Sequence, residues 1–386
     1  MRGGLGIYIH IPFCKQACHY CDFHFSTSMA KKDAMVLALQ KELELRKNEF
    51  GSEIVETIYF GGGTPSVLTS QEIDRLIRTV YDNYQVSQTP EITLEANPDD
   101  LVSVRAQSRT IFADYIDSGI NRLSIGIQSF FDDDLKLMNR AHNAREAENC
   151  ISEASKKFEN ISIDLIYGIP GMDDKRWKKN IDKALTYGIP HVSSYALTVE
   201  PRTALAHMVK KGEVADVDEE DAGRQFYMLV DIMQANGLIN YEISNFGKEG
   251  FFSKNNSAYW QGKKYLGIGP SAHSFDGARR SWNVSNNSKY LKGIDEGRLL
   301  IESEMLTTTD RYNEYIMTGL RTIWGVSLQK IASAYGAVYS NYLTKQCREY
   351  VNQGLLTFDD DILKVTKKGK FLVDGIAADL FFLEKK

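Results

Sequence analysis

Short apolar runs alternate with amphipathic stretches through the first 245 residues of the chain. Runs rich in β-branched residues begin near Leu5, Ile54, Ile92, Leu123, Ile161, Val192 and Leu238. Apolar residues at helical spacing follow each run, so we expect strands and helices to alternate. Because parallel strands need crossover helices between them, this order predicts an α/β fold with a parallel sheet.

The clearest helix follows Thr69, which forms a potential capping box with Glu72. Its apolar face carries Ile73, Leu76, Ile77, Val80 and Tyr84. Similar periodicity predicts helices over residues 31–48, 144–158, 174–187 and 219–236.

Two architectures fit this alternation, a β/α barrel and a doubly wound sheet. Unusual polar or glycine residues lie in or just after successive strands, at 61–64, Glu95, Gln128 and Asp164. In a barrel those strand ends form one shared rim, whereas a doubly wound sheet concentrates its site at one switch point. We therefore predict a whole or partial parallel β/α barrel over residues 1–245.

The composition changes twice beyond the predicted barrel. Residues 246–300 are rich in Gly, Ser, Asn and aromatics, which predicts a loop-rich insert that lines a pocket. Residues 301–386 predict helices around 312–323, 328–335 and 342–351, followed by two short strands around an acidic turn. Three helices and a hairpin indicate a small winged-helix-like α+β domain. Its nearly balanced charge favours a docking or lid module over a DNA-binding domain.

Charge and hydropathy exclude several classes of protein. The chain has 46 Lys and Arg against 51 Asp and Glu, a net charge of −5, so it has no general attraction for nucleic acid or anionic membranes. No apolar run is long enough to span a membrane, and His10, Pro12 and Cys14 interrupt the first one. We expect a cytoplasmic protein without an integral membrane segment.

Three of the five cysteines, Cys14, Cys18 and Cys21, have the spacing C-x3-C-x2-C. Thiolates bind zinc and iron–sulfur clusters. One interpretation is a structural zinc site completed by His19 or His24. The other is a four-iron cluster whose fourth iron has no protein ligand and stays open to a small molecule. The remaining two, Cys150 and Cys347, are expected to be buried as small apolar residues.

The segment GIYIHIPFCKQACHYC resembles the start of radical S-adenosylmethionine (SAM) proteins. The similar branch contains oxygen-independent coproporphyrinogen III oxidase and the HemW-type haem chaperones. Nearly the whole chain shares the order of that branch's motifs, namely YFGGGTPS, LEANPDD, RLSIGIQSF, MNRAH, DLIYGIPG, YALTVEP and YEISNF. The resemblance implies that Cys14, Cys18 and Cys21 hold a [4Fe–4S] cluster. SAM would chelate its fourth iron and yield a 5′-deoxyadenosyl radical after reduction.

The same resemblance assigns SAM contacts. Gly62, Gly63 and Thr64 would face its methionine end, Glu95 its ribose and Arg140 its carboxylate. Further implied contacts are Tyr8, Tyr20, Gln128 and Asp164. Each residue alone also has a structural interpretation: a tight turn for the glycines, a salt bridge for a carboxylate, and core packing for a tyrosine.

The chaperone branch fits better than the oxidase branch. The oxidase has a fourth cysteine two residues after the third, where this chain has Phe23, and some tens of residues before its first cysteine that are missing here. Oxidative decarboxylation of coproporphyrinogen III and a zinc-stapled binding module without redox function stay open as alternatives. Whether the chain is an enzyme is therefore left open.

A chaperone of this branch would bind haem and transfer it to an acceptor protein, and its electron donor would be a flavodoxin or ferredoxin. The branch also has a His-Asn-x-x-Tyr motif, in which Asn255 replaces the histidine here. Asparagine is not an axial haem ligand, so Tyr259 and His273 become the candidates. Arg279 and Arg280 are either propionate partners or a solvated pair.

Overall fold

The computed structural model describes residues 4–102 and 110–383. Six parallel strands lie next to one another in chain order: β1 (Leu5–Ile11), β2 (Val55–Gly62), β3 (Val86–Ala96), β4 (Arg122–Gln128), β5 (Ile161–Tyr167) and β6 (His191–Ala196). A doubly wound sheet would reverse the strand order within its set of parallel strands, and β1 to β6 keep one direction of succession. The partial β/α barrel is confirmed.

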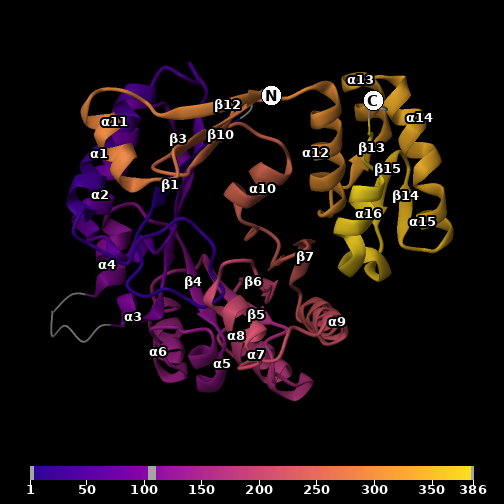
Figure 1. Ribbon diagram of the computed structural model, residues 1–386, viewed down its shortest axis with the longest axis horizontal. Coiled ribbons are helices and arrows are strands. Elements are labelled where there is room, and N and C mark those ends of the chain that lie inside the picture. Colours follow the sequence, from indigo (N-terminus) through magenta and orange to yellow (C-terminus); the bar gives the residue numbers. More distant parts are fainter. Residues whose placement is uncertain (1–3, 103–109, 384–386) are drawn as a thin grey trace.

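The predicted long helices cover this sheet (Figure 1). They are α1 (Lys32–Arg46), α2 (Ser70–Asn83), α6 (Ala144–Ala154), α7 (Asp174–Thr186) and α9 (Glu219–Ala235). Shorter elements complete the crossovers: η1 (Pro65–Val67), α3 (Pro98–Leu101), α4 (Ile111–Asp117), α5 (Asp132–Leu137) and α8 (Ala204–Lys210). The capping box of Thr69 and Glu72 is present at the start of α2. The strands read as almost continuously buried runs, as expected where both faces of a parallel sheet are covered.

The sheet extends past both ends of the parallel set instead of closing on itself. Beyond β6 it continues with β8 (Asn245–Gly247) and β7 (Ile239–Glu242), which run antiparallel to each other. The apolar run near Leu238 therefore forms β7, which has the same direction as β6 but is separated from it by the antiparallel β8, so it makes no parallel pair with the barrel strands. Its connection to β8 is only Ile243 and Ser244, too short for a crossover.

The segment 246–300 has more regular structure than its composition predicts. It forms α10 (Lys254–Trp260), β9 (Tyr265–Ile268), β10 (His273–Phe275), β11 (Arg279–Asn283) and α11 (Asn287–Asp295). Strand β9 pairs in parallel with β1, and β12 (Ile301–Met305) ends the sheet on this side. This segment is thus an extension of the sheet as well as a source of loops.

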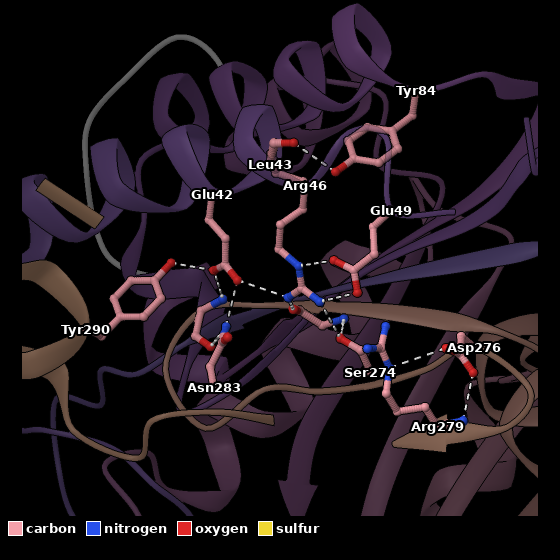
Figure 2. Close-up of polar contacts among 12 residues, drawn as sticks. Glu42, Leu43, Arg46, Glu49, Tyr84, Ser274, Asp276, Arg279, Asn283 and Tyr290 are labelled. Carbon is pink, nitrogen blue, oxygen red and sulfur yellow. Dashed lines mark hydrogen bonds and ion pairs between the residues drawn. The ribbon is translucent and has the colours of Figure 1, made fainter. Parts of the chain in front are cut away.

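A buried cluster of polar side chains connects the segment 246–300 to α1 (Figure 2). The Glu42 carboxylate accepts hydrogen bonds from Arg46 at 3.1 Å, from the Asn283 amide at 2.7 Å and from the Tyr290 hydroxyl at 2.6 Å. Arg46 also donates to the carbonyl of Gly267 at 2.8 Å. Because buried charges are costly unless they are fully paired, this cluster fixes the sheet extension against one side of α1.

The C-terminal part has its own apolar core, formed around Tyr312, Ile316, Leu320 and Leu343. Its helices are α12 (Thr308–Leu320), α13 (Leu328–Ala334), α14 (Ala337–Gln346), α15 (Arg348–Asn352) and α16 (Val373–Asp379), with η2 (Lys367–Leu372) between the last two. The predicted hairpin is present as β14 (Leu356–Asp359) and β15 (Ile362–Val365), and β13 (Val326–Ser327) joins it. Both Cys150 and Cys347 are buried, as predicted. Over the described ranges, no helix has the length and apolar character that crossing a membrane requires.

Candidate cofactor site at the cysteine loop

The carboxyl ends of β2 to β5 and the cysteine loop after β1 border one cleft of about 160 Å³, which we call the cysteine cleft. Its lining contains these predicted residues: Cys14, Cys18, Tyr20, Cys21, Gly62, Gly63, Thr64, Glu95, Gln128, Arg140 and Asp164. Tyr8 is not among the lining residues, although burial and then the nearby charge of Glu95 raise the pKa of its hydroxyl. The predicted residues therefore do come together, while their contact with a ligand stays a prediction.

The glycine segment after β2 is needed because the cysteine loop packs directly on it. The Gly63 amide donates to the carbonyl of Ile11 at 2.9 Å, and the Thr64 amide donates to the carbonyl of Phe13 at 2.7 Å. A Cβ on Gly63 would lie 2.6 Å from that Phe13 oxygen. Gly62 has a φ of +110°, and a Cβ there would lie 2.5 Å from the His10 ring. Only glycine permits this approach, which places the cysteines beside the strand ends.

The thiols lie among polar groups of the cleft. The Thr64 hydroxyl donates to the Cys14 sulfur at 3.4 Å, and the Arg140 guanidinium donates to the Cys18 sulfur at 3.3 Å. Burial raises the pKa of the Cys14 thiol to about 11 and also raises the pKa of Cys21. A metal that binds here must therefore displace thiol protons.

The histidines that would complete a zinc site make other contacts. A ring nitrogen of His19 lies 2.8 Å from the carbonyl of Leu137, and one of His24 lies 2.8 Å from the side-chain oxygen of Asn287. Neither histidine lines the cysteine cleft. Within residues 4–102 and 110–383, no three His, Cys, Asp or Glu side chains gather closely enough to hold a single metal ion.

Arg140 is the cation of the cleft. Its guanidinium donates to the side-chain oxygen of Asn97 at 2.7 Å and to the carbonyl of Gly126 at 2.9 Å. Its Nε is buried without a hydrogen-bond partner. A guanidinium with an unused donor suits the carboxylate of a bound ligand, because such pairs form strong, charge-assisted hydrogen bonds.

Two carboxyl groups, Glu95 and Asp164, line the cleft without a salt bridge to a cation in the described part of the chain. Glu95 accepts from the Tyr59 hydroxyl at 2.7 Å, and Asp164 accepts from the Ser124 hydroxyl at 3.3 Å. Burial raises the pKa of Glu95 to about 7 and that of Asp164 to about 6. The salt-bridge interpretation of Glu95 therefore does not hold, and both groups are free to bind ligand hydroxyls or amines.

The end of β4 has an unusual backbone. Gln128 has a φ of +66°, a left-handed conformation that costs free energy for a residue other than glycine. A Cβ on Gly126 would lie 2.9 Å from the Gln128 amide nitrogen and 3.1 Å from the Arg140 guanidinium. Our sequence analysis missed Gly126, Ser124 and Asn97 as lining residues, although they lie within or beside the motifs LEANPDD and RLSIGIQSF.

The lining of the cysteine cleft fits a [4Fe–4S] cluster with SAM. It combines three thiols, an arginine with an unused donor, two carboxyls without a salt bridge among the described residues, and glycines. The thiols are the ligands that iron–sulfur clusters use, and three of them leave one iron for SAM. Arg140 matches the SAM carboxylate, and Glu95 matches a ribose.

The two predicted haem ligands, Tyr259 and His273, do not lie in the same cleft. Tyr259 lines a second cleft, of about 470 Å³, which lies between α10 and the C-terminal helices, and Arg280 lines it too. His273 is not part of that lining. The Asn255 side chain is buried and accepts from the Thr57 hydroxyl at 3.0 Å, so it anchors α10. Arg279 forms an ion pair with Asp276 at 3.5 Å and is not a lining residue.

Comparison with known proteins agrees with this site. The sequence profile of the radical SAM superfamily matches residues 8–198, and that of the HemN C-terminal domain matches residues 306–372. The heme chaperone HemW of Bacillus subtilis is 34% identical over 95% of this chain and 96% of its own. The heme chaperone HemW of Escherichia coli is 31% identical over 98% of each chain.

A solved structure shows the same fold. Coproporphyrinogen III oxidase (HemN) from Escherichia coli, described as a radical SAM enzyme, has a TM-score of 0.83 at 22% identity, over 98% of this chain and 90% of that one. The long full-length matches and this common fold place the protein in a family: the chain belongs to the radical SAM superfamily, in its group of HemW- and HemN-like proteins.

Proposed function

We propose that this protein is a haem chaperone of the HemW type, which carries a [4Fe–4S] cluster and SAM in the cysteine cleft, binds haem and passes it to an acceptor protein. The observation that carries the proposal is the gathering of three cysteines and Arg140 around one cleft. The full-length similarity to proteins named heme chaperone supports the haem function.

The residues of the cleft have distinct proposed roles. Cys14, Cys18 and Cys21 would hold the cluster, which supplies one-electron reduction chemistry when it is bound. Arg140 would bind and orient the carboxylate of SAM. Glu95 would accept hydrogen bonds from the ribose. The raised pKa of Glu95 means that its charged form predominates only above about pH 7, so ribose binding through this carboxylate would weaken in acid.

Phe23 favours the chaperone over the oxidase alternative. This side chain lines the cysteine cleft and is 70% exposed, at the position where the oxidase branch has its fourth cysteine. A phenyl ring cannot replace a thiol in acid–base or metal chemistry. We therefore expect no protoporphyrinogen when the dithionite-reduced protein is incubated anaerobically with coproporphyrinogen III and SAM. Turnover in that assay would replace the chaperone proposal by the oxidase function.

Haem titration tests the proposal. Purified protein at micromolar haem should show a shifted Soret band, and the bound haem should move to apo-acceptors supplied in excess. No Soret shift would reject the chaperone function. The Tyr259→Phe variant tests ligation by that hydroxyl, and His273→Ala provides the comparison at a residue outside the second cleft. The proposal also places the protein in the cytoplasm, with a flavodoxin or ferredoxin as its electron donor.

A further inference from the structure

The second cleft, which we call the interdomain cleft, lies between α10 with β9 and β10 on one side and α12 with α13 on the other. Figure 1 shows α10 between the sheet and the C-terminal helices. Its volume of about 470 Å³ is in the range of small-molecule sites, which is roughly 300–1,000 Å³. In the described part of the chain it has no lining residue in common with the cysteine cleft.

Aromatic rings form both walls of the interdomain cleft. On the sheet side, Tyr265 packs edge to face against Tyr259 with 4.6 Å between ring centroids, and Phe275 lies 6.1 Å from Tyr265. On the C-terminal side, the rings of Tyr315 and Tyr335 lie 6.1 Å apart. Such walls favour a flat, apolar ligand.

The charge of the cleft is cationic. Among the residues that the structure describes, four basic side chains and one carboxylate line it. Two of the cations are neutralised: Lys263 pairs with Glu56 at 3.2 Å, and Arg280 pairs with Glu314. These two cations are therefore not available to a ligand without breaking an ion pair.

The other two cations, Arg311 and Lys330, form no ion pair with a carboxylate among the described residues. The Nε of Arg311 is buried without a hydrogen-bond partner. The Lys330 ammonium lies 4.1 Å from the centroid of the Tyr315 ring, and burial lowers its pKa. The buried Nε of Arg311 without an acceptor is costly, and an anionic ligand would remove that cost, whereas Lys330 is exposed at the edge of the cleft.

We infer that the interdomain cleft is the haem site, in which the two propionates pair with Arg311 and Lys330 and the macrocycle lies between the aromatic walls. A planar aromatic ring system with two carboxylates is the chemistry that satisfies both the walls and the two unpaired cations. The inference rests on the proposed haem function and adds the place and the anchoring residues. It separates the haem site from the cysteine cleft, so haem binding does not require the cluster.

The test is a haem titration of the whole protein and of the Arg311→Gln, Lys330→Gln double variant. Because a hydrogen bond to a charged group contributes substantially, we expect the Kd for haem to rise at least about tenfold. The matched control replaces Lys345 and Arg348, two exposed cations of the same domain outside the cleft, by Gln and should leave the Kd unchanged. Haem whose propionates are esterified should bind the wild type and the double variant with equal affinity.

Two further variants test separately how the charge at position 311 and the space in the interdomain cleft affect haem binding. Arg311→Lys keeps the charge and should restore part of the affinity that Arg311→Gln loses. Thr318→Trp places a bulky ring in the cleft without changing its charge and should abolish haem binding. Thermal unfolding of each variant checks that it folds.

The outcomes distinguish this inference from the function on which it rests. If the wild type binds haem and the double variant binds it equally well, the cleft assignment is overturned while the chaperone function stands. If the wild type binds no haem, both fall. A Cys14→Ser variant that keeps its haem affinity supports the separation of the two sites, and one that loses it contradicts that separation.

Discussion

The buried carboxyl of Glu95 gives the sharpest quantitative prediction. Burial raises its pKa from 4.5 to about 7, although the hydrogen bond from Tyr59 favours the charged form. The folded protein therefore binds this proton more tightly than the unfolded chain, in which the pKa has its ordinary value. The stability that Glu95 contributes is fully present below about pH 4.5 and is lost as the pH rises through about 7.

Replacing Glu95 by Gln removes this titration. The difference between a pKa of 4.5 and one of about 7 corresponds to about 3 kcal/mol. In urea unfolding of the cofactor-free protein, the stability of Glu95→Gln relative to wild type should therefore rise by about 3 kcal/mol between about pH 4.5 and about pH 8. The exposed carboxylate Glu44, replaced by Gln, provides the control and should show no comparable trend. A relative stability that varies by less than about 1 kcal/mol over this range would refute the argument.

Three further substitutions test the fold around the site. Glu42→Ala leaves the Tyr290 hydroxyl and the Gly269 amide without their acceptor, while Arg46 keeps its ion pair with Glu49, and should reduce the free energy of unfolding by about 2–6 kcal/mol. The exposed Glu44→Ala on the same helix should have little effect. Gly63→Ala drives a methyl group onto the Phe13 carbonyl and should cost about 1–3 kcal/mol and reduce iron loading, in contrast to Gly375→Ala, whose Cβ meets no neighbour. Thr69→Ala removes a helix cap and should cost about 1 kcal/mol in the same denaturation assay.

Local patterns predicted the parts of the fold that depend on neighbouring residues. The strands and helices of the barrel follow from periodicity, and the cap at Thr69 follows from four consecutive residues. The extension of the sheet was not predictable in this way, since β9 pairs with β1 across more than half of the chain. A short strand that ends in a turn carries too little periodicity to reveal a partner so distant.

In the candidate site, too, the sequence predicted residues that are close together in the chain and missed those that depend on distant contacts. Cys14, Cys18 and Cys21 are close in sequence, so their shared chemistry was readable from spacing alone. Asn97 was missed because it acts through a hydrogen bond from Arg140, 43 residues away. The composition of residues 246–300 predicted that this segment lines a pocket, and it lines the interdomain cleft. The opposite wall depends on packing against the C-terminal helices, for which the sequence has no local signal.

Iron and sulfide quantitation with electron paramagnetic resonance spectroscopy, on anaerobically prepared and reduced protein, tests the central claim that the cysteine cleft holds a cluster with an open iron. We predict equal amounts of iron and sulfide, matching one [4Fe–4S] cluster per chain, and a spectrum that changes when SAM is added. Arg140→Gln should keep the cluster but require more SAM for the same change. Zinc without iron or sulfide, or a cluster signal that SAM leaves unaltered, would contradict the claim.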